Sequence, residues 1–248
     1  MTTSRSSKLV ALSTVALLAL AGCSGEDKKD SAGPASTSST VSVPGSEAKT
    51  YTDAQLAAML KGATVNGVAL EAAPANILAE AKKGSNSGAI ADAMKQATVT
   101  PEACKTASLD NAKLMPGNAP LAVSGAKSLP MVLIRSLPSA EDAKKLVEAA
   151  GSTADACKSF NMTMTQSGQK ISMKGTTESL SVDSATSQTE SGQKTTVTAA
   201  GQTIPMTTAL GHVDNILIQV TDPGQVKLSA SQLSTVLEDV AKIVEAKK

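Results

Sequence analysis

The feature that most restricts the fold is an alternation of apolar and polar residues, which begins at Phe160 and continues in short runs to Val220. Side chains two residues apart lie on the same face of a β-strand, so this period predicts strands with one buried and one solvated face. The apolar positions are Phe160, Met162, Met164, Ile171, Met173, Leu180, Val182, Val197, Ile204, Met206, Ile216, Ile218 and Val220. Turn signals separate the runs: Ser-Gly-Gln-Lys at 167–170 and again at 191–194, and turns at 200–202 and 222–224. The sequence therefore predicts a meander of antiparallel strands.

Segments on both sides of the meander have the pattern of helices. Thr52 is a predicted N-cap with Gln55 three residues later, at the start of a helix that runs to residue 60. A helix over 140–150 is predicted from the Ser139 cap and an apolar stripe at helical spacing. The last predicted helix, over 229–247, has an apolar side that should cover the sheet. Shorter elements are expected as helices over 75–83, over 88–97 and from Pro101 onward, and as a strand over 65–70.

An apolar run over residues 129–137 predicts a further strand, near the centre of the sheet. Residues 51–248 are enough for one domain with a substantial core. The predicted fold class is α+β: an antiparallel β-sheet meander covered by helices, in a single domain, with one disulfide.

The first 23 residues have the order of an export signal. Arg5 and Lys8 precede an apolar run over 9–20, which is too short to span a bilayer and fits the core of a signal peptide. The run ends in Leu-Ala-Gly-Cys, which resembles the lipobox of bacterial lipoproteins. The resemblance implies that residues 1–22 are a signal peptide cut before Cys23, whose sulfur carries a diacylglyceryl group. The alternative is a secreted protein with a chance cysteine at this place.

A lipid on Cys23 predicts a protein held on the extracytoplasmic face of the cell membrane, with no need of a transmembrane helix. Residues 23–50 are then the lipidated cysteine and a flexible linker, because the stretch is small, polar and poor in large apolar groups. A linker of this length spans roughly 30 Å as a relaxed coil and at most about 90 Å when extended. A recognition tail is the alternative interpretation of the linker.

Three cysteines are present, and Cys23 is assigned to lipid, which leaves Cys104 and Cys157. An even pair outside the cytoplasm is expected to form a disulfide. The pair is too widely spaced for the Cys-x-x-Cys arrangement of redox sites. A structural disulfide is therefore predicted.

Composition excludes some classes of ligand. The chain has one tyrosine, Tyr51, one phenylalanine, Phe160, and no tryptophan. Sugars and single-stranded nucleic acids are usually stacked on aromatic side chains, which are scarce here. Without Arg5 and Lys8 the chain carries 21 basic against 22 acidic residues, so charge gives no reason to expect a nucleic-acid partner.

His212 is the only histidine and therefore the first candidate for a catalytic group. Asp214 could complete a Ser-His-Asp triad, but no Gly-x-Ser-x-Gly motif accompanies it. Glu141 and Asp142 are interpreted as charges of a helix's first turn, not as an acid–base pair. We therefore expect no catalytic residues.

No cofactor or metal site is predicted either. Zinc needs three or four clustered ligands, which the sequence does not offer. Met162 and Met164 would share a strand face and could bind copper(I), although methionine is more often a core filler. Asn161-Met162-Thr163 matches a glycosylation sequon and is interpreted as a chance match.

The order of elements resembles the extracellular sensor domains of actinobacterial serine/threonine kinases and the lipoproteins that share this domain. The resemblance covers residues 52–246: an opening helix, Pro-x-x-Cys, an apolar strand, Ser-Ala-Glu-Asp-Ala, Ala-Cys-Lys-Ser-Phe, a meander and a closing helix. It implies a disulfide between Cys104 and Cys157 and a cleft for an unidentified ligand. The chain departs from the kinase-linked members, which have further disulfides and more aromatic residues.

The predicted function is a ligand-sensing or partner-binding module without catalysis, held at the membrane through Cys23. Its partner would be an unidentified small molecule, lipid or protein. The alternative is an envelope lipid or glycolipid carrier with an apolar cavity. An envelope hydrolase that uses His212 and a purely structural spacer are further hypotheses.

Overall fold

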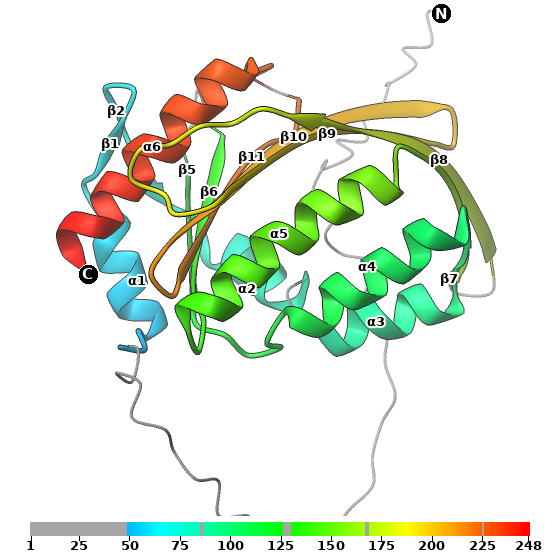
Figure 1. Cartoon of the computed structure of the whole chain (residues 1–248), viewed down its shortest axis with the longest axis horizontal. Coiled ribbons are helices and arrows are strands. Elements are labelled where there is room, and N and C mark those ends of the chain that lie inside the picture. The colour runs from blue at the N-terminus through cyan, green and yellow to red at the C-terminus, as the bar shows by residue number, and fades with distance from the viewer. Residues whose placement is uncertain (1–48, 85–86, 126–129, 167–168, 225) are drawn as a thin grey trace, which may run out of the picture.

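The computed structural model describes residues 49–84, 87–125, 130–166, 169–224 and 226–248 (Figure 1). The predicted signal peptide, Cys23 and nearly all of the predicted linker lie outside the described residues. The elements in chain order are α1 (Asp53–Leu60), β1 (Thr64–Val65), β2 (Val68–Ala69), β3 (Glu71–Ala72), α2 (Ala75–Gly84), α3 (Ser87–Gln96), β4 (Thr98–Thr100), α4 (Glu102–Leu114), β5 (Leu121–Gly125), β6 (Met131–Ser136), α5 (Ala140–Ala156), β7 (Ser159–Gln166), β8 (Gln169–Leu180), β9 (Glu190–Ala199), β10 (Gln202–Val213), β11 (Ile216–Asp222) and α6 (Ala230–Lys247).

The strands form a large antiparallel sheet and a small hairpin. The large sheet has nine strands in the order β3-β5-β6-β11-β10-β9-β8-β7-β4, and β1 pairs with β2 separately. Strands β7 to β11 follow one another in space as they do in the chain, so the predicted meander is confirmed. The α+β class is confirmed with it, and so is the disulfide between Cys104 and Cys157.

Helices cover both faces of this sheet (Figure 1). Helices α1 and α6 pack on one face, against residues such as Ile218, and α5 packs on the other face, against Leu217. Both side chains are buried, with exposed fractions of 0% and 3%. The expectation of one wet face is therefore wrong for β11 and for the second half of β10, because both strands are buried there and each face has a covering helix.

The predicted helix starts are confirmed by their caps. The Thr52 and Ser229 hydroxyls accept hydrogen bonds from the backbone N–H of Gln55 and Gln232, and both pairs form capping boxes. Ser139 caps α5, which continues to Ala156 instead of ending at residue 150. The helix passes through Gly151, which faces the hydroxyl of Ser191 on β9.

One predicted strand and one predicted turn have a different structure from the one expected. The strand expected over 65–70 is the β1–β2 hairpin, in which Asn66 and Gly67 both have positive φ, as a tight two-residue turn requires. The second Ser-Gly-Gln-Lys, at 191–194, lies inside β9 and not in a turn. A Cβ on Gly192 would lie 2.5 Å from a methyl carbon of Val182, so close packing explains this glycine.

The strand predicted over 129–137 is β6, and it lies third from one edge instead of at the centre. Three short strands, β3, β4 and β5, had no clear sequence pattern and were not expected.

Candidate functional site

The disulfide joins Cys104 on α4 to Cys157, the C-cap residue of α5. The two Cα atoms are 4.7 Å apart, and the residues are only 3% and 6% exposed. Met162 and Met164 pack against this cluster together with Phe160. The structure therefore favours the interpretation of these methionines as core fillers.

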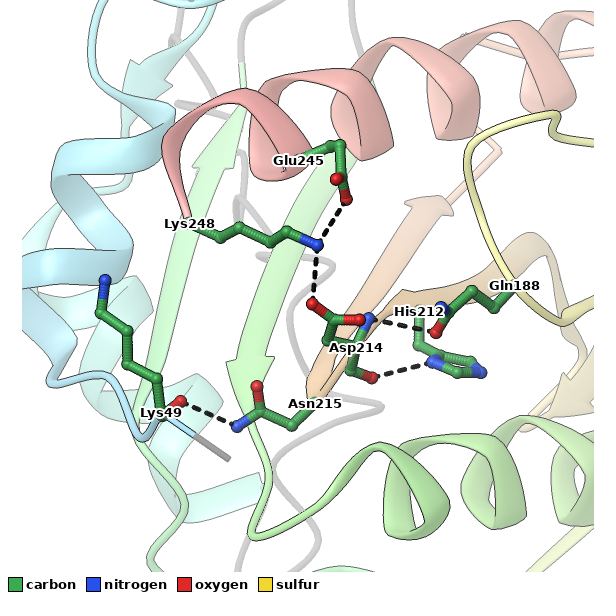
Figure 2. Close-up of polar contacts among 7 residues, drawn as sticks. All are labelled: Lys49, Gln188, His212, Asp214, Asn215, Glu245 and Lys248. Atoms are coloured by element: carbon green, nitrogen blue, oxygen red, sulfur yellow. Dashed lines mark hydrogen bonds and ion pairs between the residues drawn. The ribbon is translucent and has the colours of Figure 1, made fainter. Parts of the chain in front are cut away.

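His212 lies in β10 and does not form a Ser-His-Asp triad (Figure 2). Its Nδ1 lies 2.9 Å from the backbone carbonyl oxygen of Asp214, so this nitrogen carries the proton. The Asp214 carboxylate instead binds the ammonium group of Lys248, at 2.6 Å. His212 Nε2 is buried and has no hydrogen-bond partner among the described residues, so no serine hydroxyl there is placed for activation.

The chain enters the domain beside the turn between β10 and β11. We call residues 49–51 the entry segment. The Asn215 side-chain amide donates to the carbonyl oxygen of Lys49, at 3.1 Å (Figure 2). The same amide donates to the carbonyl oxygen of Leu137, at 2.7 Å. The Tyr51 N–H donates to the Ser136 hydroxyl, at 3.1 Å. The β10–β11 turn and the start of the domain are thus held together.

The two acidic residues at the start of α5 have structural roles. The Ser139 hydroxyl donates to the Asp142 carboxylate, at 2.8 Å, and Glu141 pairs with Lys145 one helical turn later. These contacts agree with the interpretation of Glu141 and Asp142 as first-turn charges of α5.

A third acidic residue, Glu238 of α6, binds the loop between β8 and β9. Its carboxylate accepts hydrogen bonds from the Ser184 hydroxyl, at 2.6 Å, and from the Thr186 N–H and hydroxyl, at 3.0 and 2.9 Å. These bonds, the Ser184 hydroxyl first, outweigh burial and lower the pKa of Glu238 to about 2. Nearby Glu190 behaves in the opposite way, because burial raises its pKa.

A charged cleft lies between α1, α2 and the segment before β5. It has a volume of about 390 Å³ and is lined by Thr52, Asp53, Lys82 and residues 117–121. The Asp53 carboxylate accepts from the Leu121 N–H, at 2.9 Å, and forms an ion pair with Lys82. Burial raises the pKa of Asp53, but the bonds from Lys82 and Leu121 outweigh it, so that its pKa lies below the usual value. The two charged groups of this cleft are therefore already satisfied by each other and by the fold.

A larger hollow lies on the exposed surface of the sheet, over β7, β8 and the β9–β10 turn. It has a volume of about 430 Å³, and we call it the hydroxyl hollow. Its lining residues are Asn161, Met162, Thr163, Ser172, Met173, Lys174, Thr198, Ala200 and Gly201.

Strand register explains why polar groups gather there. Thr163 lies directly opposite Ser172, and Lys174 lies opposite Thr198, so these side chains share one face of the sheet. The Thr163 and Ser172 hydroxyl oxygens are 3.1 Å apart. A hydroxyl offers one donor and two acceptor positions, so each retains hydrogen-bonding capacity for a ligand.

The hydroxyl hollow was not predicted from the sequence. Its signal was present as the polar half of the alternation, at Asn161, Thr163, Ser172 and Lys174. Alternation alone does not tell which strands are neighbours, so the grouping became visible only with the register.

Two further observations concern metal ligands and membrane-spanning helices. In the part of the chain that the structure describes, no three His, Cys, Asp or Glu side chains gather as metal ligands. None of the helices there is long and apolar enough to cross a membrane.

The sequence matches no protein-family model and no curated protein. Among solved structures, the chain is similar to the extracellular domain of PknH from Mycobacterium tuberculosis, with a TM-score of 0.35 and 16% sequence identity. The match covers 60% of this chain and 78% of that chain. Values this low show neither a shared family nor a shared function.

Proposed function

We infer that the protein is a lipoprotein of the cell envelope whose domain binds a ligand or partner without catalysing a reaction. In this proposal residues 1–22 are removed, Cys23 carries the lipid, and residues 24–50 link it to a single domain over 51–248 on the extracytoplasmic side. The signal-like start, the lipobox-like Leu-Ala-Gly-Cys and the disulfide between Cys104 and Cys157 support it.

The hydroxyl hollow is the observation that carries the binding function. It lies over β7 and β8, whereas the entry segment leads into α1 at the opposite end of the molecule (Figure 1). A domain tethered at the α1 end would present this hollow away from its anchor. Hydroxyl, amide and ammonium groups line it, so it suits a polar ligand that both accepts and donates hydrogen bonds and carries negative charge near Lys174.

Two alternative functions have less support. A lipid carrier needs an apolar cavity between sheet and helices, but this space contains fully buried side chains such as Ile218, Leu233 and Leu237. A hydrolase that uses His212 would need a nucleophile within reach of Nε2, and the described residues place none there.

Photo-crosslinking in intact cells tests the binding role. A photoactivatable residue at Ser172, inside the hollow, should give a discrete adduct, and one at Thr235 on the exposed side of α6 should not. Adding Lys174→Ala and Thr198→Ala to the Ser172 probe should weaken the adduct severalfold, because they remove polar groups of the same hollow. Equal adducts from both probe positions, or an adduct unaffected by the two substitutions, would argue against the hydroxyl hollow as the binding surface.

A further inference from the structure

A small pocket lies beside the entry segment, between α1 and the last turn of α6. It has a volume of about 230 Å³ and is lined by Lys49, Tyr51, Gln55, Ala58, Met59 and Lys247. We call it the lysine pocket. The three α1 residues share one face of the helix because they are three and four positions apart, and the two lysines approach from different parts of the chain.

The charges of the lysine pocket are unbalanced. The Lys49 ammonium lies 4.9 Å from the centre of the Tyr51 ring, and the Lys247 ammonium donates to the carbonyl oxygen of Met59, at 2.8 Å. Neither forms an ion pair with a carboxylate of the described residues, and no acidic residue lines the pocket. An ammonium has three donors, so both lysines retain donors for a further acceptor.

The neighbouring lysine shows a different arrangement. Lys248 binds the carboxylates of Asp214, at 2.6 Å, and Glu245, at 2.8 Å, and these two bonds raise its pKa (Figure 2). Asp214 and Glu245 are thus engaged by Lys248, and neither of them lines the lysine pocket. Two ammonium groups and a tyrosine around a small hollow suit a compact anion such as a phosphate group.

We propose that the lysine pocket binds the phosphate of an anionic phospholipid headgroup and so docks the entry end of the domain on the membrane. This rests on the proposed lipid anchor at Cys23. Lys49 follows the predicted linker directly and lines the pocket, and a linker of this length would span only roughly 30 Å if it were a relaxed coil. The anchor therefore keeps the pocket at a high effective concentration of headgroups. Docking at this end leaves the hydroxyl hollow facing away from the bilayer.

The chain supplies its own reporter for this contact. Tyr51 lines the pocket and is the only tyrosine, and tryptophan is absent. Intrinsic tyrosine fluorescence therefore comes from the pocket alone. Phospholipids with a nitroxide on the headgroup quench a fluorophore at short range, so quenching reports whether the pocket lies at the headgroup level of the bilayer.

The test uses the lipidated protein in vesicles of phosphatidylcholine that include a fixed fraction of headgroup-nitroxide phosphatidylcholine, with and without phosphatidylglycerol. We expect strong quenching of Tyr51 only when phosphatidylglycerol is present. The variant Lys49→Gln/Lys247→Gln should reduce the quenching roughly tenfold or more, toward the level in phosphatidylcholine alone. The matched control Lys170→Gln/Lys194→Gln removes the same charge from exposed positions of β8 and β9 that line neither the hydroxyl hollow nor the lysine pocket, and it should leave the quenching unchanged.

Because Lys247 also bonds to α1, Lys49→Gln alone is the second variant, and it should lower the quenching without shifting the melting temperature. Equal quenching in both lipids, no quenching in either, or an equal loss in the Lys170→Gln/Lys194→Gln control would overturn the proposal. Inorganic phosphate is added to protein in phosphatidylcholine vesicles as a further arm. If it alters Tyr51 emission as strongly as phosphatidylglycerol does, the pocket holds a free phosphate and the headgroup assignment is wrong. Failure of the anchor is seen separately, as protein that does not sediment with vesicles.

Discussion

At the scale of single residues, Asp222 shows how one buried carboxylate can build a loop. It is fully buried at the end of β11, and its two oxygens accept hydrogen bonds from the N–H groups of Gly224, Val226 and Leu228, at 3.0, 3.1 and 2.9 Å. The sequence marks Asp222 only as part of a turn signal, because a motif does not show how many backbone donors a side chain will reach. This carboxylate connects the end of β11 to the start of α6.

Replacing Asp222 with alanine is expected to destabilise the fold by about 2–4 kcal/mol, because three backbone donors lose a charged acceptor. Urea unfolding of the purified protein measures the change. Asp110→Ala serves as the control, since Asp110 forms an exposed pair with Lys113 and should contribute less than about 0.5 kcal/mol. Equal effects of the two substitutions would contradict the assigned role of Asp222.

Glu238 should make stability depend on pH. Its pKa is lowered to about 2 in the folded state, so the fold favours the charged carboxylate. The stabilisation is fully present above pH 4.5, the ordinary value, and is lost as pH falls toward 2. At pH 7, Glu238→Gln should lower the free energy of unfolding by about 1–2 kcal/mol, and the difference should vanish near pH 2.

Unfolding of both proteins across this pH range provides the measurement, with Glu141→Gln as control. Glu141 is 62% exposed in a surface pair with Lys145, so its replacement should have little effect at any pH. A loss in Glu238→Gln that stays constant from pH 7 to 2 would show that the charge of Glu238 is not what stabilises the loop.

At the scale of elements, the sequence predicted best where local chemistry and burial agree. The capping residues Thr52 and Ser139 were identified correctly, because a cap depends on residues only three apart. The sequence did not predict β3, β4 and β5, which have two, three and five residues. Strands this short exist because the neighbouring strand is already in place, and no local pattern shows that.

The disulfide is the covalent link between α4 and α5. It closes a loop across a sequence separation of 53, so the double variant Cys104→Ala/Cys157→Ala should lose about 4 kcal/mol in the chain-entropy model. Urea unfolding with and without a reductant provides the measurement. The wild-type midpoint should fall in reductant and that of the variant should not. A wild-type midpoint that does not respond, with both thiols shown to be reduced, would contradict this role.

At the scale of the whole molecule, the two candidate surfaces differ in how far they could be foreseen. Lys49 and Lys247 lie near opposite ends of the domain and line one pocket only because α1 and α6 pack on the same face of the sheet. The hydroxyl hollow depends on register across β7, β8 and β9. Neither grouping is encoded in a local motif, whereas the proposed anchor at Cys23 depends on a contiguous segment.

The anchor gives a prediction for the intact protein in its cell. The Cys23→Ser variant should leave the membrane fraction, because the sulfur that would carry the lipid is gone, while the domain keeps its melting temperature. Mass spectrometry of the N-terminal peptide should find a diacylglyceryl group on Cys23 in the wild type. Membrane-bound wild-type protein with an unmodified Cys23 thiol would contradict the anchor.

The hydrogen bonds of the entry segment have a mechanical consequence. Asn215, in the turn just before β11, and Ser136, the last residue of β6, hold the backbone of residues 49–51 against the ends of two interior strands of the sheet. A pull on the linker would therefore reach the ends of these two strands before it reaches α1. We expect a domain dragged by its tether to resist as one rigid body until these few bonds break, and α1 to unravel only after that.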